Sequence, residues 1–344
     1  MSLTRRNLME SGGFGALLLA AGSACSRSDQ AGSNDLAELD GVETASRIKA
    51  GELSASEAVE AAIDRAERVE GRINAIVTKT YRRAREAAAQ HNAGAGPFAG
   101  VPTFIKDLYD VTGVPTHFGS RAFPIYKGKE QTPVVDAFLG MGVISLGKSS
   151  TPEFGLSATT EPLNSGKTRN PWNTDHSAGG SSGGAAALVA SGVVPIAHAS
   201  DGGGSIRIPA SCCGNVGLKV SRGRNPMGRN DEAVGPISLS VHGVQTRTVR
   251  DTAAVAAAIA LPARESGLHP LPLVTAPGQE RRRIAVMTRG LAGAEPAPAV
   301  LQATREVAAL CSDLGHYVEE AALPVDEGLS RDFTLYWAAF AQAF

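Results

Sequence analysis

The sequence predicts an α/β fold built on a mixed or mostly parallel sheet. Helical patterns alternate along the 344 residues with short, continuously apolar segments, as is typical of strands that are buried on both faces. Hydrophobic residues make up 43% of the chain and charged residues 19%, and this balance indicates a globular rather than a disordered protein.

Each element follows from a local pattern. Ser54 and Glu57 have the spacing of a capping box, and apolar residues follow at helical intervals as far as Val69. Beyond this first helix, helical spacing and short apolar runs alternate. The expected elements are a helix at 81–92, a strand that ends at 105, a helix at 133–140, a strand at 143–146, a helix at 185–190, a strand at 193–197, a helix at 252–261, a strand at 283–287, and helices at 299–314 and 333–344.

The N-terminus has the pattern of an export signal. Arg5 and Arg6 precede an apolar run at 14–21, and small residues lead to Cys25, as in a bacterial twin-arginine signal. The apolar run has about half of the ~20 residues that span a bilayer, so it is not a membrane anchor by itself. Cys25 is a candidate for lipidation after cleavage, although Gly22 stands where lipoprotein signals usually carry Leu.

These signals divide the chain into an export signal at 1–25, a polar tether at 26–34 and one domain at 35–344. We therefore expect an exported bacterial protein of the periplasm or cell envelope, which contacts a membrane only through a lipid on Cys25. No sequence pattern indicates the oligomeric state.

Charge and metal-ligand spacing exclude two classes of function. Lys plus Arg number 33 and Asp plus Glu 34, for a net charge of −1, so the chain has no basic excess with which to neutralise nucleic-acid phosphates. The seven histidines and four cysteines show no H-x-x-x-H or paired C-x-x-C spacing. We expect no nucleic-acid partner, no metal and no cofactor.

Two familiar motifs occur in the wrong context. Residues 142–149 match the phosphate-loop pattern G-x-x-x-x-G-K-[ST], but the middle residues Val-Ile-Ser-Leu favour a strand, and Pro152 would fall inside the helix that must follow. Residues 179–183 match the G-x-S-x-G nucleophile elbow, with His242 and His316 downstream as candidate bases. That elbow needs a buried strand before it, and a turn sequence precedes it here, so this second motif stays an alternative.

Two glycine-serine clusters, at 179–184 and 201–209, are the strongest chemical signal. A flexible linker is the plain alternative, but both clusters lie between apolar helix and strand segments. Glycines let several backbone N–H groups turn toward one point, as an oxyanion hole beside a nucleophile requires. The expected donors are the N–H groups of Gly202, Gly203, Gly204 and Ser205.

A serine nucleophile needs a base, and neither cluster holds a suitably placed histidine. Lys106 instead follows the apolar run Val-Pro-Thr-Phe-Ile, which would carry its side chain into the interior. Desolvation there disfavours the charged form of a lysine and so favours its basic, neutral form. A lone lysine is more often a solvated surface charge, so this role depends on burial.

Taken together, these segments resemble the amidase signature family of serine hydrolases from about Leu53 to Pro324. The resemblance rests on a dense series of motifs in order. They are Gly100-Val101-Pro102 with Lys106-Asp107, Gly147-Lys148 with 151–155, 170–173, 178–184, 201–209, and 217–219 with Gly223-Arg224.

The resemblance implies an α/β/α sandwich around a mixed, largely parallel sheet and a small-molecule amide as substrate. It implies Ser205 as nucleophile, Ser181 as the bridging serine after a cis peptide, and neutral Lys106 as base. An acyl-enzyme would form on Ser205. Supporting residues would be Asp201 and Arg207, which we expect to pair, and Ser182.

The run at 200–204 and the segment at 241–244 resemble the branch of the family named for 6-aminohexanoate cyclic dimer hydrolases. Family members run well beyond residue 344, and the apolar helix at 333–344 ends without a cap or tail. We therefore expect the chain to lack a C-terminal portion of its domain. Candidate aromatic residues for an acyl pocket are Phe104, Phe123, Phe154 and Trp172, although such residues are more often part of the core.

Two other functions remain open at this point. One is the glutamine-hydrolysing subunit of a tRNA amidotransferase, against which the export signal speaks. The other is a non-catalytic exported binding protein or fragment, which would fail to react with a serine-directed probe.

Overall fold

The computed structural model describes residues 36–92, 94–228, 238–290, 294–322, 325 and 328–342. The expected export signal at 1–25, its Cys25 and the tether at 26–34 lie outside these residues. None of the helices in the described ranges has the length and apolarity needed to cross a bilayer.

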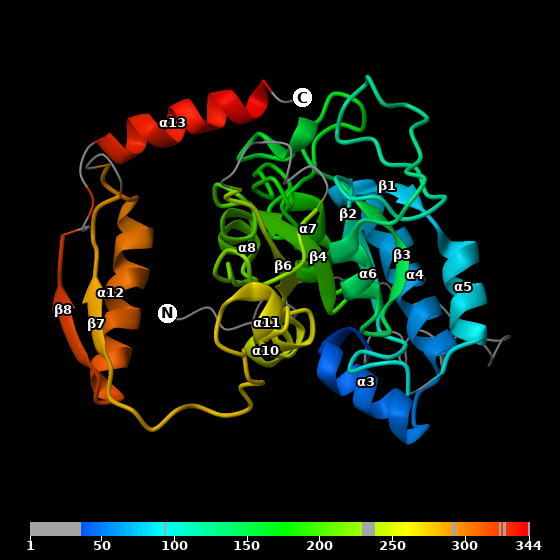
Figure 1. Ribbon diagram of the computed structural model, residues 1–344, viewed down its shortest axis with the longest axis horizontal. Coiled ribbons are helices and arrows are strands. Elements are labelled where there is room, and N and C mark those ends of the chain that lie inside the picture. Colours follow the sequence, from blue (N-terminus) through cyan, green and yellow to red (C-terminus); the bar gives the residue numbers. More distant parts are fainter. Residues whose placement is uncertain are drawn as a thin grey trace, which may run out of the picture.

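Helices and strands alternate along the chain (Figure 1), as the sequence predicts. The first half contains α3 (Gly41–Ala50), α4 (Ala55–Ile73), β1 (Ile76–Lys79), α5 (Tyr81–Ala89), β2 (Pro102–Lys106), α6 (Pro133–Leu139), β3 (Ile144–Ser149), the 3-10 turn η1 (Glu153–Gly155) and α7 (Gly183–Ala190). The second half contains β4 (Ile196–Asp201), α8 (Arg207–Cys213), β5 (Val216–Gly217), β6 (Val241–Thr246), α10 (Val249–Ala258), α11 (Ala263–Ser266), β7 (Arg283–Val286), α12 (Pro298–Asp313), β8 (Tyr317–Glu320) and α13 (Gly328–Ala341).

The strands form mixed sheets. Strand β3 pairs in parallel with β2 and antiparallel with β1, whereas β6 pairs antiparallel with both β4 and β5. The Thr103 hydroxyl of β2 donates to the Ile196 carbonyl oxygen of β4 at 3.0 Å and so links the two three-stranded sheets. The mixed sheet is as expected, but among the strand pairs of the described residues two are parallel and three antiparallel, so parallel pairing is less frequent than expected.

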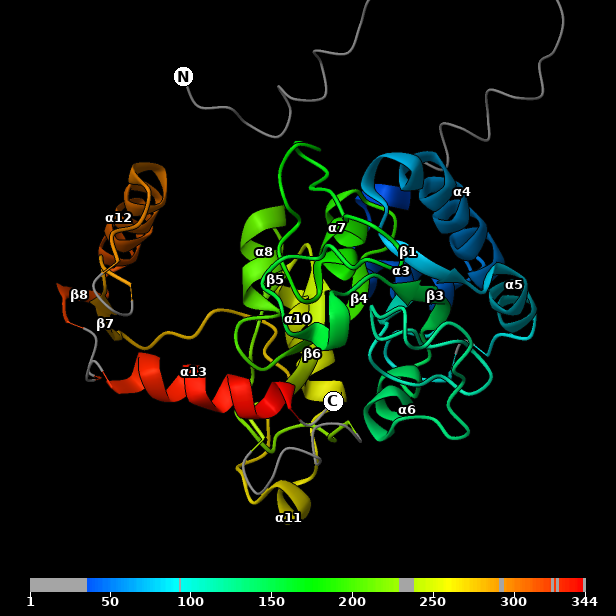
Figure 2. The same ribbon diagram turned by 90° about the horizontal axis from the view of Figure 1, so that it is seen from above.

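Helices cover both faces of these strands, which confirms the α/β class. Phe104 of β2 packs into one core with residues of α4, α5 and α7, whereas the next residue, Ile105, packs into a second core with α6 and α10. Successive side chains of a strand point to opposite faces, so the two cores lie on opposite sides of β2. Figure 2 shows α4 and α6 on either side of the strands.

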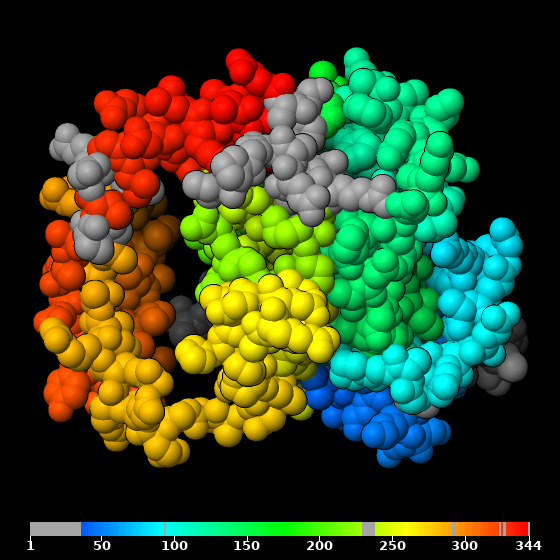
Figure 3. Space-filling model, in the orientation of Figure 1, coloured from blue at the N-terminus to red at the C-terminus, as the bar shows by residue number. Residues whose placement is uncertain are grey.

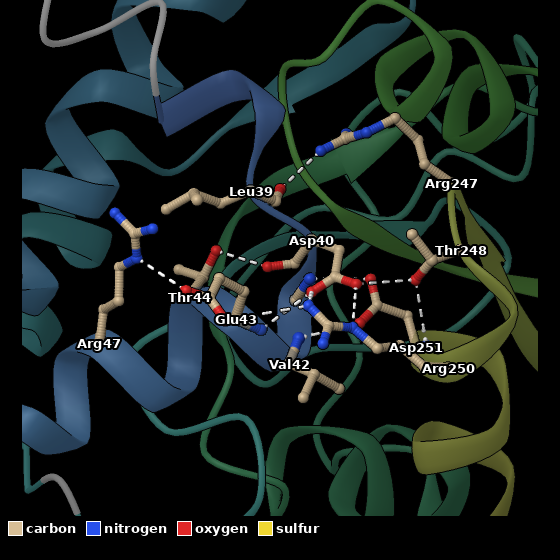
Figure 4. A network of polar contacts seen from close by, with 11 residues as sticks. Leu39, Asp40, Val42, Glu43, Thr44, Arg47, Arg247, Thr248, Arg250 and Asp251 are labelled. Atoms are coloured by element: carbon tan, nitrogen blue, oxygen red, sulfur yellow. Dashed lines mark hydrogen bonds and ion pairs between the residues drawn. The ribbon is translucent and has the colours of Figure 1, made fainter. Parts of the chain in front are cut away.

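A buried polar network fixes the start of α3 to the start of α10 (Figure 4). Asp251 accepts hydrogen bonds from the N–H groups of Gly41 and Val42 at 2.8 and 2.9 Å, and Arg250 forms an ion pair with Asp40. Burial raises the pKa of Asp40, but hydrogen bonds from Arg250, the Glu43 N–H and Thr248 oppose this effect, and the pKa is lowered overall. The N-terminal helix is thereby held on the sandwich.

The segment after α11 forms a separate layer. Strands β7 and β8 pair in parallel, with α12 between them in the chain, and α13 then runs back over the sandwich (Figure 1). A hollow lined by Ser211 of α8 and by apolar residues of β7 and α12 separates this unit from the sandwich, as the space-filling view shows (Figure 3). Helix α13 is the element that reaches from this unit to the candidate site.

Most element boundaries agree with the sequence patterns, and the capping box at Ser54 is present. Strand β4 begins three residues later than expected, because Pro195 has no N–H for the ladder and the strand starts after it. The patterns did not indicate α3, β1, η1, α8, β5, β6, α11 or β8. Helix α8 contains Pro209, which its first turn tolerates because N–H groups there have no partner within the helix.

Candidate active site

Lys106 lies at the end of β2, and its side chain is fully buried. Its Nζ atom donates to Ser181 Oγ at 2.7 Å and to Ser200 Oγ at 3.0 Å. The sequence-based prediction paired Lys106 with Ser181, and the structure places these two side chains in direct contact. The geometry meets the condition that Lys106 points inward.

Ser181 lies in the loop between residue 178 and α7, and the peptide bond before it is cis. The resemblance to the amidase signature family implied this bond. The Thr160 hydroxyl donates to the Gly179 carbonyl oxygen at 2.8 Å and accepts from the Gly183 N–H at 3.2 Å. Thr160 therefore holds the loop on both sides of Ser181.

Ser205 lies in the turn between β4 and α8, and Asp201 organises this turn. The Asp201 carboxylate accepts two hydrogen bonds of 2.9 Å from the Arg207 guanidinium, and it also accepts from the N–H groups of Gly204 and Ile206. Burial raises the pKa of Asp201, but Arg207 and the two N–H groups outweigh it and lower the pKa overall. The expected pairing of Asp201 with Arg207 is confirmed.

The same contacts correct one prediction. The sequence predicts the Gly204 N–H to be a donor of the oxyanion hole. In the structure this N–H donates to Asp201 Oδ1 at 2.8 Å, so it does not point to a substrate oxygen. Gly204 has a φ of +127°, a conformation that favours glycine, and this turns its N–H toward the carboxylate. Within the described part of the chain, the N–H groups of Gly202, Gly203 and Ser205 donate to no protein atom.

Ser182 connects the two glycine-serine clusters. Its hydroxyl donates to the Ser200 carbonyl oxygen at 3.2 Å and accepts from the Ser200 N–H at 3.3 Å. Its own N–H donates to the Ser205 carbonyl oxygen at 3.2 Å. Ser182 thus fixes the loop of Ser181 against the turn of Ser205, a supporting position.

The three serines of the site face one cavity. Ser181, Ser200 and Ser205 line it together with Gly202, Tyr109 and apolar residues of the neighbouring loops and of α13. A substrate carbonyl in this cavity would lie next to both hydroxyls and to the N–H groups of the Ser205 turn. The arrangement is suited to nucleophilic attack by a serine with a buried amine as the final base.

A second lysine, Lys148 on β3, is also fully buried near the site. Its Nζ donates to Asp107 Oδ1 at 3.1 Å and to the Thr116 hydroxyl at 3.0 Å. Burial lowers the pKa of Lys148, and the Asp107 carboxylate opposes this shift. Lys148 lies within a strand and forms an ion pair, which confirms that 142–149 is not a phosphate-binding loop.

The structure does not support the nucleophile-elbow alternative either. Among the described residues, no strand immediately precedes the loop of Ser181. His242 is buried on β6, where its ring packs against Tyr109 with a centroid distance of 4.7 Å, and His316 accepts a hydrogen bond from the Arg282 N–H near β8. In the described ranges, no group of three or more His, Cys, Asp or Glu side chains could hold a metal ion.

Sequence reasoning missed two contributors to the site. Ser200 contacts Lys106 only because β4 lies beside β2, and a serine at a strand end carries no signal of that contact. Trp337 lines the cavity from α13, more than 130 residues after Ser205 in the chain. Of the four candidate aromatic residues, Phe154 lines the cavity, and Phe123 packs edge-on against Phe154 with a centroid distance of 6.0 Å. Phe104 is in the core, and Trp172 is 49% exposed at another place.

Comparisons with known proteins show the family of the chain. The chain matches the family model described as Amidase over residues 57–344. The protein AmiC of Mycobacterium tuberculosis is 46% identical over 309 residues, which are 90% of this chain and 65% of AmiC. The 6-aminohexanoate-cyclic-dimer hydrolase of Paenarthrobacter ureafaciens is 36% identical over 299 residues, or 82% of this chain and 59% of the enzyme.

The solved structures that this chain resembles also include amidases and related hydrolases. The structure of 6-aminohexanoate cyclic dimer hydrolase complexed with substrate has a TM-score of 0.76 at 30% identity, and the match covers 90% of this chain and 69% of that one. A bacterial aryl acylamidase of the amidase signature family has a TM-score of 0.75 at 32% identity, covering 86% and 63%. The chain belongs to the amidase signature family.

Proposed function

We propose that this protein is a serine amidohydrolase that cleaves the C–N bond of small-molecule amides through an acyl-enzyme on Ser205. The observation that carries the proposal is the buried Lys106 amine, 2.7 Å from Ser181 Oγ, behind a cavity that Ser181 and Ser205 share. Membership of the amidase signature family supports this reaction class, and the names of the relatives support amides as substrates.

In the first half-reaction, neutral Lys106 accepts a proton from Ser181 Oγ while Ser181 accepts one from Ser205 Oγ. Ser205 Oγ attacks the carbonyl carbon and forms a tetrahedral intermediate. The C–N bond then breaks, Ser181 protonates the leaving nitrogen, and Lys106 returns its proton to Ser181. The amine departs and the acyl group remains as an ester of Ser205.

In the second half-reaction, water replaces the amine. Ser181 and Lys106 remove a proton from the water as it attacks the ester carbonyl, and the same proton returns to Ser205 Oγ when the acid is released. In both steps the negative oxygen would be held by the N–H groups of Gly202, Gly203 and Ser205. Each such donor contributes about 10²–10³-fold to the rate in comparable sites.

The test is labelling of the mature chain with a fluorophosphonate probe, followed by mass mapping of the modified residue and rate measurements on neutral linear and cyclic amides. We expect the label on Ser205, its loss in Ser205→Ala, and the loss of amide turnover in the same variant. The control is Ser312→Ala, which removes an exposed hydroxyl on α12 and should change neither. Turnover by Ser205→Ala, or an unlabelled wild-type chain, would contradict the proposal and favour a non-catalytic binding role.

We further propose that the protein is exported and acts in the periplasm or cell envelope, on the basis of Arg5, Arg6 and the apolar run at 14–21. Replacing both arginines by lysine should retain the chain in the cytoplasm, as fractionation would measure. If Cys25 is lipidated, Cys25→Ser should move the exported protein from the membrane to the soluble fraction. Cytoplasmic residence of the wild type would instead favour the amidotransferase-subunit alternative.

A further inference from the structure

Helix α13 supplies one wall of the catalytic cavity. Tyr336, Trp337 and Phe340 line it from this helix, together with the loop residues Leu108 and Phe154. The Trp337 and Phe340 rings stack with a centroid distance of 5.5 Å, so the wall is a continuous aromatic surface. Ser181 and Ser205 line the same cavity.

The polar atoms of this wall are engaged elsewhere. Trp337 Nε1 donates to the Leu156 carbonyl oxygen at 3.1 Å, and the Tyr336 hydroxyl accepts from the Leu239 N–H at 3.3 Å. Phe340 has no polar side-chain atom. The surface that α13 presents to the cavity therefore consists mainly of ring carbons, which bind apolar groups.

Trp337 also lies directly against the turn of Ser205. A Cβ built on Gly203 would come within 3.3 Å of the indole ring, which is tighter than an ordinary contact, whereas one built on Gly202 would make an ordinary contact at 3.6 Å. The close approach of the ring to the turn therefore depends on the glycine at 203. A group bonded to a carbonyl held at Ser205 would therefore extend along the indole ring.

Charge is absent from the described lining of this cavity. Its polar side chains are the hydroxyls of serine and tyrosine and the indole N–H, and no Asp, Glu, Lys, Arg or His is among them. A charged group on the substrate would lose its hydration here without gaining an opposite charge, which is strongly unfavourable. The cavity thus discriminates by charge as well as by shape.

We propose that the protein selects amides whose acyl group is uncharged and apolar, aromatic or medium-chain alkyl, and that Trp337 is the residue that determines this specificity. We assign the selectivity to the acyl group of the substrate, because this group stays in the cavity as an ester of Ser205 while the amine departs. This inference rests on the proposed function and goes beyond it by naming the substrate class.

A matched series of primary amides tests the charge preference. Hexanamide, 6-aminohexanamide and adipamate have similar length, and they carry a neutral, a cationic and an anionic chain end respectively. We expect kcat/KM for hexanamide to exceed that for either charged amide by at least about 100-fold. The kcat/KM for benzamide should be close to that for hexanamide, and the kcat/KM for L-glutamine should be as low as those for the charged amides.

Variants of α13 test the assignment to Trp337. In Trp337→Ala, the ratio of kcat/KM for hexanamide to that for acetamide should fall about tenfold, because the longer chain loses the indole surface. Trp337→Phe should restore most of the ratio. Leu335→Ala on the same helix removes a side chain that is 63% exposed, and it should leave the ratio unchanged.

The outcomes separate this inference from the proposed function. Equal or faster turnover of the charged amides by a chain that labels at Ser205 would overturn the inference alone. An unchanged hexanamide-to-acetamide ratio in a folded Trp337→Ala protein would overturn the role of Trp337. Failure of the wild type both to label and to hydrolyse any amide would overturn the proposed function and this inference with it.

Discussion

Lys106 and Lys148 lie on neighbouring parallel strands, and both are fully buried, yet their surroundings differ. Lys148 Nζ faces the Asp107 carboxylate at 3.1 Å, whereas Lys106 Nζ contacts the hydroxyls of Ser181 and Ser200. A carboxylate at this distance stabilises the charged form of Lys148, while hydroxyls can exchange a proton with Lys106. Burial alone therefore does not identify a catalytic lysine, and the partner decides its role.

Strand geometry explains how the two lysines obtain different partners. Asp107 directly follows Lys106 in the chain, and successive residues of an extended segment point in opposite directions. The Asp107 carboxylate consequently reaches Lys148, and its second oxygen accepts the His117 N–H at 3.1 Å. The Lys-Asp dipeptide thus serves the site and the structural ion pair at once.

Replacing Lys106, the lysine that contacts the hydroxyls, should reduce amide turnover more than any other change considered. Lys106→Met keeps the length and burial of the side chain but removes the base, so kcat for amides should fall by at least about 10⁴-fold, as for other members of a proton-transfer triad. Because no charge is left unpaired, the protein should stay folded, as circular dichroism would verify. Substantial turnover in a folded Lys106→Met protein would contradict the assigned base.

Replacing the other buried lysine, Lys148, should reduce the stability of the fold. Lys148→Met leaves the Asp107 carboxylate buried without its partner, and the free energy of unfolding should drop by about 3–5 kcal/mol. Denaturant unfolding measures the change. The double variant Lys148→Met/Asp107→Leu should recover much of the loss, and a double variant no more stable than the single one would contradict the ion-pair explanation.

A smaller effect is expected at Ser200, which positions Lys106 without reacting. Ser200→Ala removes one of the two hydroxyls at Nζ, and kcat should fall about tenfold while KM changes little. Ser200→Thr retains a hydroxyl and should restore part of the rate. A change in the pH profile of kcat would accompany a role through Lys106, whereas an unchanged profile and rate would refute it.

The smallest effect is a shift in acid sensitivity at the turn of Ser205. Folding lowers the pKa of Asp201 from 3.8, so its carboxylate adds stability above that pH and this stability is lost as the pH falls through the lowered value. Arg207→Ala removes the main opposing cation and should raise the pH at which acid disrupts the turn. Fluorophosphonate labelling of Ser205 after acid exposure measures this midpoint, and an unmoved midpoint would argue against the coupling.

Much of the site was predictable because its members occur in local motifs. Lys106 ends an apolar strand, Ser181 lies in a glycine cluster before a helix, and Asp201 stands six residues before Arg207. Each of these patterns encodes local backbone geometry, and the structure agrees with them. The Gly204 N–H was assigned wrongly because its direction depends on one φ angle and on the Asp201 side chain, which spacing does not reveal.

The rest depends on contacts between distant segments. Ser200 contacts Lys106 because β2 and β4 lie side by side. Trp337 contacts the Ser205 turn from α13, which follows that turn by more than 120 residues. Strand direction was also not encoded, since buried strands are apolar in either orientation. Periodicity identifies elements and their buried faces, but not which elements become neighbours.

The proposed relay requires Lys106 to be neutral in the folded protein, whereas the ion pair with Asp107 requires Lys148 to be charged. NMR of protein labelled with ¹³C at lysine Cε reports both states, since the shift changes on protonation, and Lys106→Met and Lys148→Met assign the two buried resonances. At pH 8 the resonance lost in Lys106→Met should have the shift of a neutral amine, and the one lost in Lys148→Met that of an ammonium group. A protonated Lys106 in the active protein at this pH would contradict the proposed relay.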